Sequence, residues 1–260
     1  MDGPEETTWF ESLDRAFDRA LARCVRGAPA VSVLFSGGVD SALVATGVRD
    51  LATVRLVTVG TEGSRDIGWA RTAAQRLGLA VGVVKVAEAD VVGVQERIAV
   101  RLAGLGGLRR SVQVSLALAL SHAADPVALA GQGADELFGG YAHFRGLAGR
   151  ELSERRRIDW ERLRREDWPV SQRLAADLGR ELRSPFLDDE FAQAALDVPL
   201  EPVSGTDLTK PRLRRWARHR GLPAEITVRP KLAMQYGSGV ARALGRARRT
   251  AAVRGPDRAT

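Results

Sequence analysis

Residues 30–41 read AVSVLFSGGVDS and decide the fold. An apolar run with strand character ends at Phe35, two glycines follow, and a helical pattern begins at Val39. Glycines let a backbone approach an anion closely, and the first turn of a helix presents free N–H groups to it. The order therefore predicts a phosphate cradle that contacts a nucleotide through Ser36, Gly37, Gly38, Asp40 and Ser41. A strand–turn–helix whose glycines are incidental is the competing interpretation.

Short apolar runs alternate with helical patterns over the first half of the chain. Strands are predicted at residues 31–35, 54–59, 81–86 and 127–130. Helices are predicted at residues 9–24, 39–50, 67–77, 89–105 and 111–123. Alternation of this kind is typical of an α/β fold with a doubly wound parallel sheet. Ligands of such sheets bind beyond the carboxyl ends of the strands, and glycine-rich segments follow two of the predicted strands.

Beyond Tyr141 the pattern is helical, and no strand is predicted there. Helices are expected at residues 145–178, 188–196, 208–220 and 240–249, separated by prolines. We therefore expect a nucleotide-binding sheet domain over residues 1–141 and a helical subdomain over residues 142–250. Residues 251–260 are expected to form a frayed tail.

Charge is distributed unevenly along the 260 residues, whose net charge is +7. Residues 208–260 carry 14 Arg and Lys but only two acidic residues, so the rest of the chain is net negative. A basic part of this kind attracts a polyanion, either ATP or a nucleic acid. The mixed charges of residues 145–167 are expected instead to form a solvated, salt-bridged helical face.

Composition excludes several classes of protein. No apolar run approaches the ~20 residues that span a bilayer, and the acidic N-terminus lacks a signal-peptide layout. We therefore expect a cytoplasmic protein without a membrane segment. The single cysteine, Cys24, excludes an intramolecular disulfide. His122, His143 and His219 do not share metal-ligand spacing, so structural or solvated roles are predicted for them.

A second glycine-rich segment, AGQGADELFGGY, covers residues 130–141. Gly131 and Gly133 are expected to contact the nucleotide. Magnesium prefers carboxylate and phosphate oxygens, so Asp40 and Asp135, one from each loop, are the predicted ligands of a Mg²⁺ ion carried by ATP. Glu136 is interpreted as an acid that stabilises a helix start.

These motifs resemble those of a known family. SGGVDS is similar to the pyrophosphate loop of ATP pyrophosphatases, and GQGADELFGGY is similar to the second signature of asparagine synthetases. Residues 58–66 (TVGTEGSRD) and 179–188 (GRELRSPFLD) resemble further family segments. Together with basic residues near the C-terminus, five motifs occur in the family's order over roughly residues 10–240. The resemblance is to the C-terminal synthetase domain of this family.

The resemblance implies a reaction in two halves. A carboxylate, with aspartate favoured, attacks the α-phosphorus of ATP to give an acyl-adenylate and magnesium pyrophosphate. Ammonia then displaces AMP to form an amide. Lys231 is expected to stabilise charge on the phosphates and the adenylate, and Lys210 to contact pyrophosphate, although both could be solvated surface lysines. Val59 and Gly60 are expected to shape the adenine and ribose pocket.

Two departures from the family pattern leave the product open. The family's glutaminase domain begins with a nucleophilic cysteine after Met, where this chain has Asp2. Ammonia is therefore expected to be free or to come from a separate glutaminase. Gln132 stands where the family usually has a glutamate that accepts a proton from the amine, and an amide does not titrate near neutrality. Asp167, or Glu166 beside it, is the alternative acceptor, and surface helical acids are the competing interpretation.

Three other functional interpretations stay open. Gln132 is compatible with an amide or lactam synthetase that acts on another carboxylate. The basic C-terminal part is compatible with a tRNA-modifying or RNA-binding ATP pyrophosphatase, although the 130–141 and 179–188 motifs argue against it. A nucleotide-binding homologue that has lost the second half-reaction is the last alternative. All of them keep ATP as the ligand of the first loop.

Overall fold

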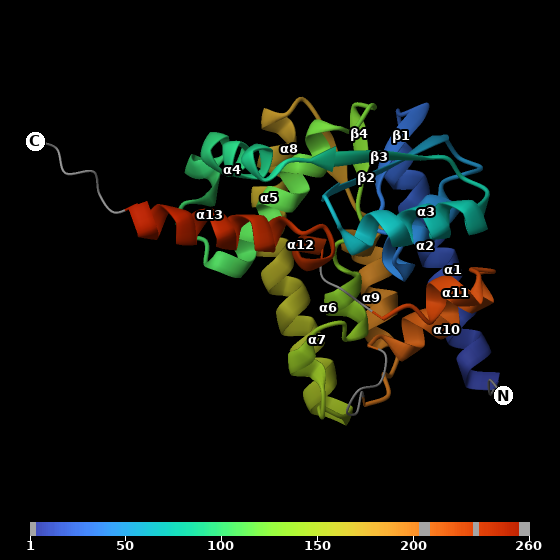
Figure 1. Cartoon of the computed structure of the whole chain (residues 1–260). Coiled ribbons are helices and arrows are strands. Elements are labelled where there is room, and N and C mark those ends of the chain that lie inside the picture. Colours follow the sequence, from blue (N-terminus) through green and yellow to red (C-terminus); the bar gives the residue numbers. More distant parts are fainter. Residues whose placement is uncertain (1–3, 203–208, 231–233, 255–260) are drawn as a thin grey trace, which may run out of the picture.

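A five-stranded, fully parallel sheet lies at the centre of the molecule (Figure 1). The computed structural model describes residues 4–202, 209–230 and 234–254. The strand order is β3-β2-β1-β4-β5. The strands are β1 (Ala30–Leu34), β2 (Thr53–Thr61), β3 (Val81–Val86), β4 (Val127–Leu129) and β5 (Glu181–Arg183). The predicted doubly wound parallel sheet is confirmed.

Helices precede, connect and follow the strands. Those of the first half are α1 (Pro4–Val25), α2 (Val39–Gly47), α3 (Arg65–Leu77), α4 (Glu88–Arg97), α5 (Gly107–Ser121) and α6 (Ala134–Phe138). Those of the second half are α7 (Gly149–Arg162), α8 (Trp168–Asp177), α9 (Asp189–Asp197), α10 (Pro211–His219), α11 (Ala224–Thr227), α12 (Met234–Gly237) and α13 (Val240–Arg254). Short 3₁₀ turns are η1 (Ala99–Leu102), η2 (Ala142–Phe144) and η4 (Pro185–Leu187), and η3 (Leu163–Asp167) is a π-helical turn.

The two faces of the sheet carry separate apolar clusters, because successive strand side chains point to opposite faces. One cluster joins Val31 and Val33 of β1 to buried residues of α1, α2, α3, α6, α9 and α10. The other joins Leu34 and Val57 to buried residues of α4, α5, α8 and α13. Helices from the second half of the chain therefore cover both faces of the sheet, and the domain division near residue 141 stays a prediction.

One strand was missed by the sequence reasoning. β5 pairs with β4 in register Val127–Glu181 through Leu129–Arg183, so the expectation of no strand beyond Tyr141 is wrong. The segment has a single apolar residue, Leu182, between two charged ones, and it lies at the edge of the sheet. An edge strand of three residues gives too short an alternation to be recognised.

The strand order reverses between β1 and β4. From β1 the chain proceeds outward through β2 to β3, whereas β4 and β5 lie on the other side of β1. In open α/β sheets such a reversal creates a crevice beyond the carboxyl ends of the two central strands. The SGGVDS segment follows β1 and the GQGADE segment follows β4, so the topology places both loops at this crevice. Among the helices of the described residues, none has the length and apolar character that a membrane span requires.

Candidate active site

The SGGVDS loop turns tightly from β1 into α2. Gly37 has φ +71°, and a Cβ there would lie 2.6 Å from the carbonyl oxygen of Trp69. Only glycine fits this turn without strain. The Ser41 hydroxyl donates to the Gly38 carbonyl at 3.1 Å, and the Ser36 backbone N–H donates to the Ser41 hydroxyl oxygen at 3.3 Å. These bonds fix the loop so that the first turn of α2 faces the crevice.

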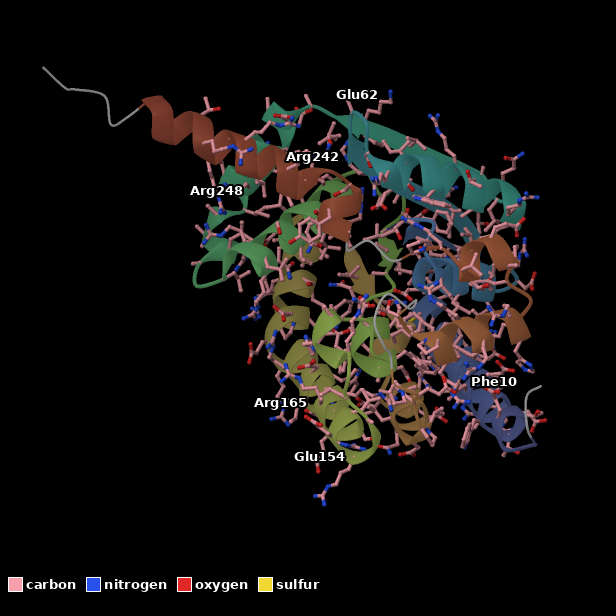
Figure 2. All side chains as sticks on the ribbon, turned by 60° about the horizontal axis from the view of Figure 1, so that its bottom comes forward. Phe10, Glu62, Glu154, Arg165, Arg242 and Arg248 are labelled. Atoms are coloured by element: carbon pink, nitrogen blue, oxygen red, sulfur yellow. The ribbon has the colours of Figure 1, made fainter. Side chains whose placement is uncertain are left out.

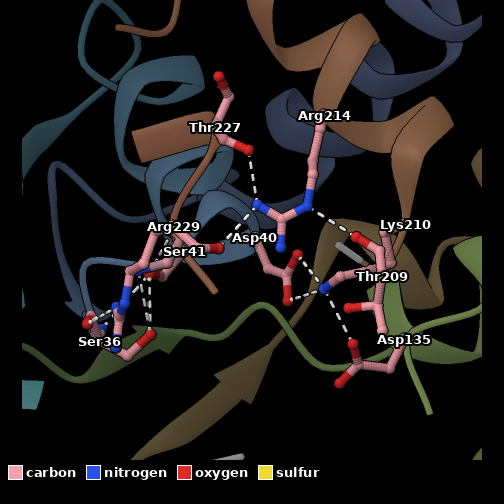
Figure 3. A network of polar contacts seen from close by, with 10 residues as sticks. Ser36, Asp40, Ser41, Asp135, Thr209, Lys210, Arg214, Thr227 and Arg229 are labelled. Carbon is pink, nitrogen blue, oxygen red and sulfur yellow. Dashed lines mark hydrogen bonds and ion pairs between the residues drawn. The ribbon is translucent and has the colours of Figure 1, made fainter. Parts of the chain in front are cut away.

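Asp40, Asp135 and Lys210 form the electrostatic centre of the site (Figure 3). The Lys210 ammonium donates to both carboxylate oxygens of Asp40 at 2.5 Å and lies 2.8 Å from Oδ1 of Asp135. Its side chain is only 1% exposed. Burial by itself would lower the pKa of Lys210, but the charges of Asp135 and Asp40 outweigh it, so the pKa lies above its ordinary value. Lys210 is therefore a permanent cation between the two loops.

Arg214 holds the chain that presents Lys210. Its guanidinium donates to the backbone carbonyls of Thr209 at 2.7 Å, Thr227 at 2.6 Å and Arg229 at 2.9 Å. Lys210 has φ +59° and is the one non-glycine with positive φ among the described residues. Since a left-handed backbone is unfavourable for lysine, this clamp and the two carboxylates must stabilise it.

Arg229 links the phosphate loop to the end of β2 and the start of α3. It donates to the Ser36 carbonyl at 2.5 Å and to Asp66 Oδ1 at 2.8 Å, and both charged side chains are buried. Burial lowers the pKa of Arg229 and raises that of Asp66, and their mutual attraction offsets part of each shift. The arginine's position was not predicted from its spacing, because residues 66 and 229 meet only in the folded chain.

A cavity of 480 Å³ extends from this network across the carboxyl ends of β1 and β4. Most of the residues predicted to bind nucleotide, metal or substrate line it: Ser36, Gly38, Asp40, Ser41, Val59, Gly131, Gln132, Gly133, Asp135, Asp167 and Lys210. Gly37 and Gly60 are not part of its wall, and Gly37 instead shapes the loop behind it. Lys231 lies outside the described residues. The wall beside β2 and α5 is apolar, with Val57, Val59, Leu118 and Ala119.

A second set of cavity-lining residues, the Gln132 end, comprises Gln132, Glu136, Tyr141, His143, Arg155, Asp159, Arg162 and Asp167. Ser184 donates to the Gln132 carbonyl at 2.7 Å, while the side-chain Oε1 is buried and no described residue donates to it. Beside it, the Tyr141 hydroxyl donates to Glu136 at 2.6 Å, and Glu136 is buried. Glu136 is therefore a partner of Tyr141 in the cavity wall as well as a residue of the first turn of α6, which its sequence position had indicated.

Residues of α7 and η3 complete this end. Asp167 lies in the cavity wall and accepts from Arg109 at 2.6 Å, whereas Glu166 contacts Arg109 at 3.3 Å but is not part of the wall. The widened turn that carries Asp167 has a local cause. Pro169 lacks an N–H and its ring clashes with a regular helical carbonyl at residue 165, so the helix opens into a π turn.

His143, Asp159, Arg155 and Arg162 also line this end, and the sequence reasoning missed them. His143 was expected to be structural or solvated, and the chain gave no spacing signal for its partner Asp159. The outer face of α7 does carry the predicted solvated ion pairs, such as Arg150 with Glu154 at 2.6 Å. Figure 2 shows Glu154 on the outside of the molecule. The same helix therefore has one face in water and another in the cavity.

Within the part of the chain that the structure describes, six of the 14 cations in residues 208–260 form ion pairs with acids of the preceding sequence. These pairs are Lys210 with Asp40 and Asp135, Arg212 and Arg215 with Glu6 and Glu201, Arg220 with Asp14 and Asp18, Arg229 with Asp66, and Arg246 with Glu88. Part of the uneven charge therefore joins the C-terminal part to the rest of the chain.

Comparison with known proteins gives the family of this chain. The family described as asparagine synthase matches residues 12–165 and 146–258. The chain belongs to this family. A putative glutamine-hydrolyzing asparagine synthetase 1 of Methanocaldococcus jannaschii is 31% identical over 267 residues, which cover 88% of this chain and 49% of that protein. The glutamine-hydrolyzing asparagine synthetase of Bos taurus is 31% identical over 252 residues, 90% of this chain and 44% of that one.

The chain spans about half the length of the curated relatives it matches. Among solved structures, an NH3-dependent NAD synthetase from Campylobacter jejuni is similar with a TM-score of 0.34 and 16% identity, covering 58% of this chain and 72% of that chain. The match to the family confirms the resemblance that the ordered motifs predicted.

Proposed function

We propose that this chain is an ATP-dependent ligase that forms AMP and pyrophosphate, activates a carboxylate as its adenylate, and amidates it with ammonia. Aspartate is the favoured acyl substrate, as the names of the relatives suggest. The observation that carries the proposal is the Asp40–Lys210–Asp135 network, which joins the two family signatures at one end of a single cavity.

The chain's own groups suit ATP at that end. The first turn of α2, from Val39 to Ser41, has backbone N–H groups without helical partners, and these bind phosphate oxygens well. Val57 and Val59 provide an apolar surface for the adenine. Arg229 also lines the cavity and donates to the Ser36 carbonyl, so its guanidinium lies at the SGGVDS loop, where Asp66 balances its charge.

Asp40 and Asp135 fit a magnesium ion carried by ATP. Magnesium in nucleotide sites takes one or two carboxylates together with phosphate oxygens. Two carboxylates already share one cation here, and no group of three or more His, Cys, Asp and Glu side chains in the described ranges could hold a metal by itself. When bound, the ion would neutralise charge on the pyrophosphate leaving group.

The first half-reaction then places the acyl carboxylate between the two ends of the cavity. A carboxylate oxygen attacks the α-phosphorus, and pyrophosphate leaves beside Lys210. The positive charge of the Lys210 ammonium stabilises the negative charge of the leaving pyrophosphate. We propose that Lys231 stabilises the phosphates and the adenylate. We also propose that Asp167, fixed by Arg109, positions the acyl substrate from the α8 side. The amine reaches the adenylate from the side of Gln132.

Exchange of labelled pyrophosphate into ATP tests the proposal. We expect exchange that depends on Mg²⁺ and on one acid from a panel of carboxylic acids that includes aspartate, followed by amide release when ammonium is added. Exchange with a different acid would assign another substrate to the same chemistry. Absence of exchange with every acid would overturn the proposal. Lys231→Ala should lower exchange, and unchanged exchange would remove Lys231 from the mechanism.

We also propose that ammonia reaches this chain from a glutaminase, because the matched relatives are named as glutamine-hydrolyzing. The test compares glutamine with ammonium as the nitrogen donor for the isolated chain. Amide formation from ammonium but not from glutamine is the expected result. Equal use of both donors would contradict the need for a separate glutaminase activity.

A further inference from the structure

His143 and Asp159 form a hydrogen-bonded pair in the wall of the cavity. His143 Nε2 lies 2.5 Å from Asp159 Oδ2, and both residues line the cavity that Gln132 also lines. The Asp159 side chain is 7% exposed and that of His143 is 45% exposed. With Nε2–H directed at the carboxylate, Nδ1 carries the lone pair of the neutral ring. None of the described residues is hydrogen-bonded to Nδ1.

Tyr141 connects this pair to the signature loop. Its ring stacks on His143 with 5.5 Å between centroids, and its hydroxyl donates to Glu136, the neighbour of Asp135. Burial, together with the charges of Glu136, Asp135 and Asp159, raises the pKa of Tyr141 well above its ordinary value. The Tyr141 hydroxyl therefore stays protonated near neutral pH and is not itself a base.

The other acids of the Gln132 end are already engaged by donors. Glu136 accepts from Tyr141, and Asp167 accepts from the Arg109 guanidinium. Gln132 has no titratable group. Nδ1 of His143 has no hydrogen bond to a described residue, and an imidazole nitrogen can accept a proton from an amine.

We propose that His143, oriented by Asp159, accepts the proton of the attacking amine, a role that rests on the proposed amide-forming function. As the N–C bond forms at the acyl carbon, Nδ1 takes a proton from the amine nitrogen. The C–O bond to the AMP phosphate then breaks, and its electron pair leaves with AMP. The products are the amide, AMP and an imidazolium ion, which releases its proton to water through the exposed side of His143.

Charged groups of the cavity wall accompany His143. Asp159 is paired with its Nε2 and also contacts Arg155 at 3.2 Å, and Arg162 lines the same cavity. Glu136 accepts from the hydroxyl of Tyr141, whose ring stacks on His143. The pH profile of amide formation is therefore compared between the wild type and a variant without the imidazole, at saturating ammonium.

The test separates the two half-reactions in the full chain. We expect His143→Gln to lower kcat for amide formation by about 10²–10⁴-fold, the usual contribution of a general base. ATP–pyrophosphate exchange with the active acid should stay within about twofold, because the first half-reaction does not use this base. The unchanged exchange also shows that the variant is folded. Asp159→Asn, which keeps the imidazole but removes its anionic partner, should give a smaller loss of kcat.

His219→Gln is the matched control. His219 forms a similar pair with Asp14 at 3.1 Å and is 40% exposed, but neither residue lines the cavity. It should change neither half-reaction. An unchanged kcat and pH profile in His143→Gln, or an equal loss of exchange and amide formation, would overturn the role of His143 while leaving the proposed function standing. If the wild type exchanges with no acid, the proposed function is overturned and the role of His143 falls with it.

Discussion

The two ends of the cavity differ in how their charged groups are held. At the end where we propose that phosphates bind, Asp40 and Asp135 come from two separate segments and share the buried ammonium of Lys210 from a third. At the Gln132 end, where we propose that the amine reacts, His143 is partly exposed and the Gln132 side-chain oxygen has no described donor. Preorganised charges suit one fixed ligand, which in the proposed function is the phosphates of ATP. Exposed side chains, and polar atoms without a hydrogen-bond partner, are available to form hydrogen bonds with a second substrate.

The largest effect should follow from breaking the phosphate end. Asp135→Asn removes one of the two carboxylates that fit magnesium, so we expect exchange and amide formation to fall together by about 10³-fold. Pyrophosphate exchange measures the first loss and amide release the second. Asp50→Asn, an exposed acid just after α2, is the control. A loss confined to amide formation would contradict the assignment of Asp135 to ATP.

The second effect concerns Lys210. Lys210→Met leaves two carboxylates facing each other without their cation, so we expect the free energy of unfolding to fall by about 1–3 kcal/mol. Mg²⁺ without ATP should then raise the melting temperature of the variant more than that of the wild type. Thermal unfolding with and without Mg²⁺ checks both statements.

Lys85→Met is the control for that experiment. Lys85 pairs with Glu62 at 3.1 Å on the surface, where both side chains are largely exposed, and such pairs contribute little. It should change neither stability nor the response to Mg²⁺. A Lys210→Met variant that responds to Mg²⁺ as the wild type does would contradict the view that the ammonium occupies a cation position.

A smaller effect is expected from Asp167 at the Gln132 end. Asp167→Asn weakens its contact with Arg109, so KM for the acyl substrate should rise about tenfold, the cost of one charge-assisted hydrogen bond. Steady-state kinetics with varied acid measure it. Glu166→Gln alters a neighbouring acid that contacts Arg109 outside the cavity wall and should leave KM unchanged. Equal effects of both variants would mean that Asp167 acts only by holding Arg109.

The smallest effect is predicted for Gln132→Glu in the wild type. A carboxylate there adds a second base beside His143, so amide formation should increase by about threefold or less, with exchange unchanged. In the His143→Gln background the same substitution should restore a larger share of the lost activity. Gln172→Glu, at an exposed position of α8, is the control. A large gain in the wild type would indicate that Gln132, and not His143, limits the second half-reaction.

Local patterns were sufficient for much of the fold. The predicted strand at residues 81–86 agrees with β3, because an unbroken β-rich run bounded by loop residues is a local signal. β5 was missed because its three residues pair only in the assembled sheet. The predicted helix at 89–105 ends early as α4 and continues as η1, and boundaries of this kind depend on packing.

The sequence by itself determined the family and the glycine turn between β1 and α2, because a turn with positive φ and a close backbone neighbour is compatible only with glycine. It did not determine which side chains meet across the crevice. Only the tertiary structure placed Lys210 between Asp40 and Asp135, and His143 against Asp159 in the same cavity. Contacts between residues far apart in the chain depend on how helices pack on the sheet, which no local pattern records.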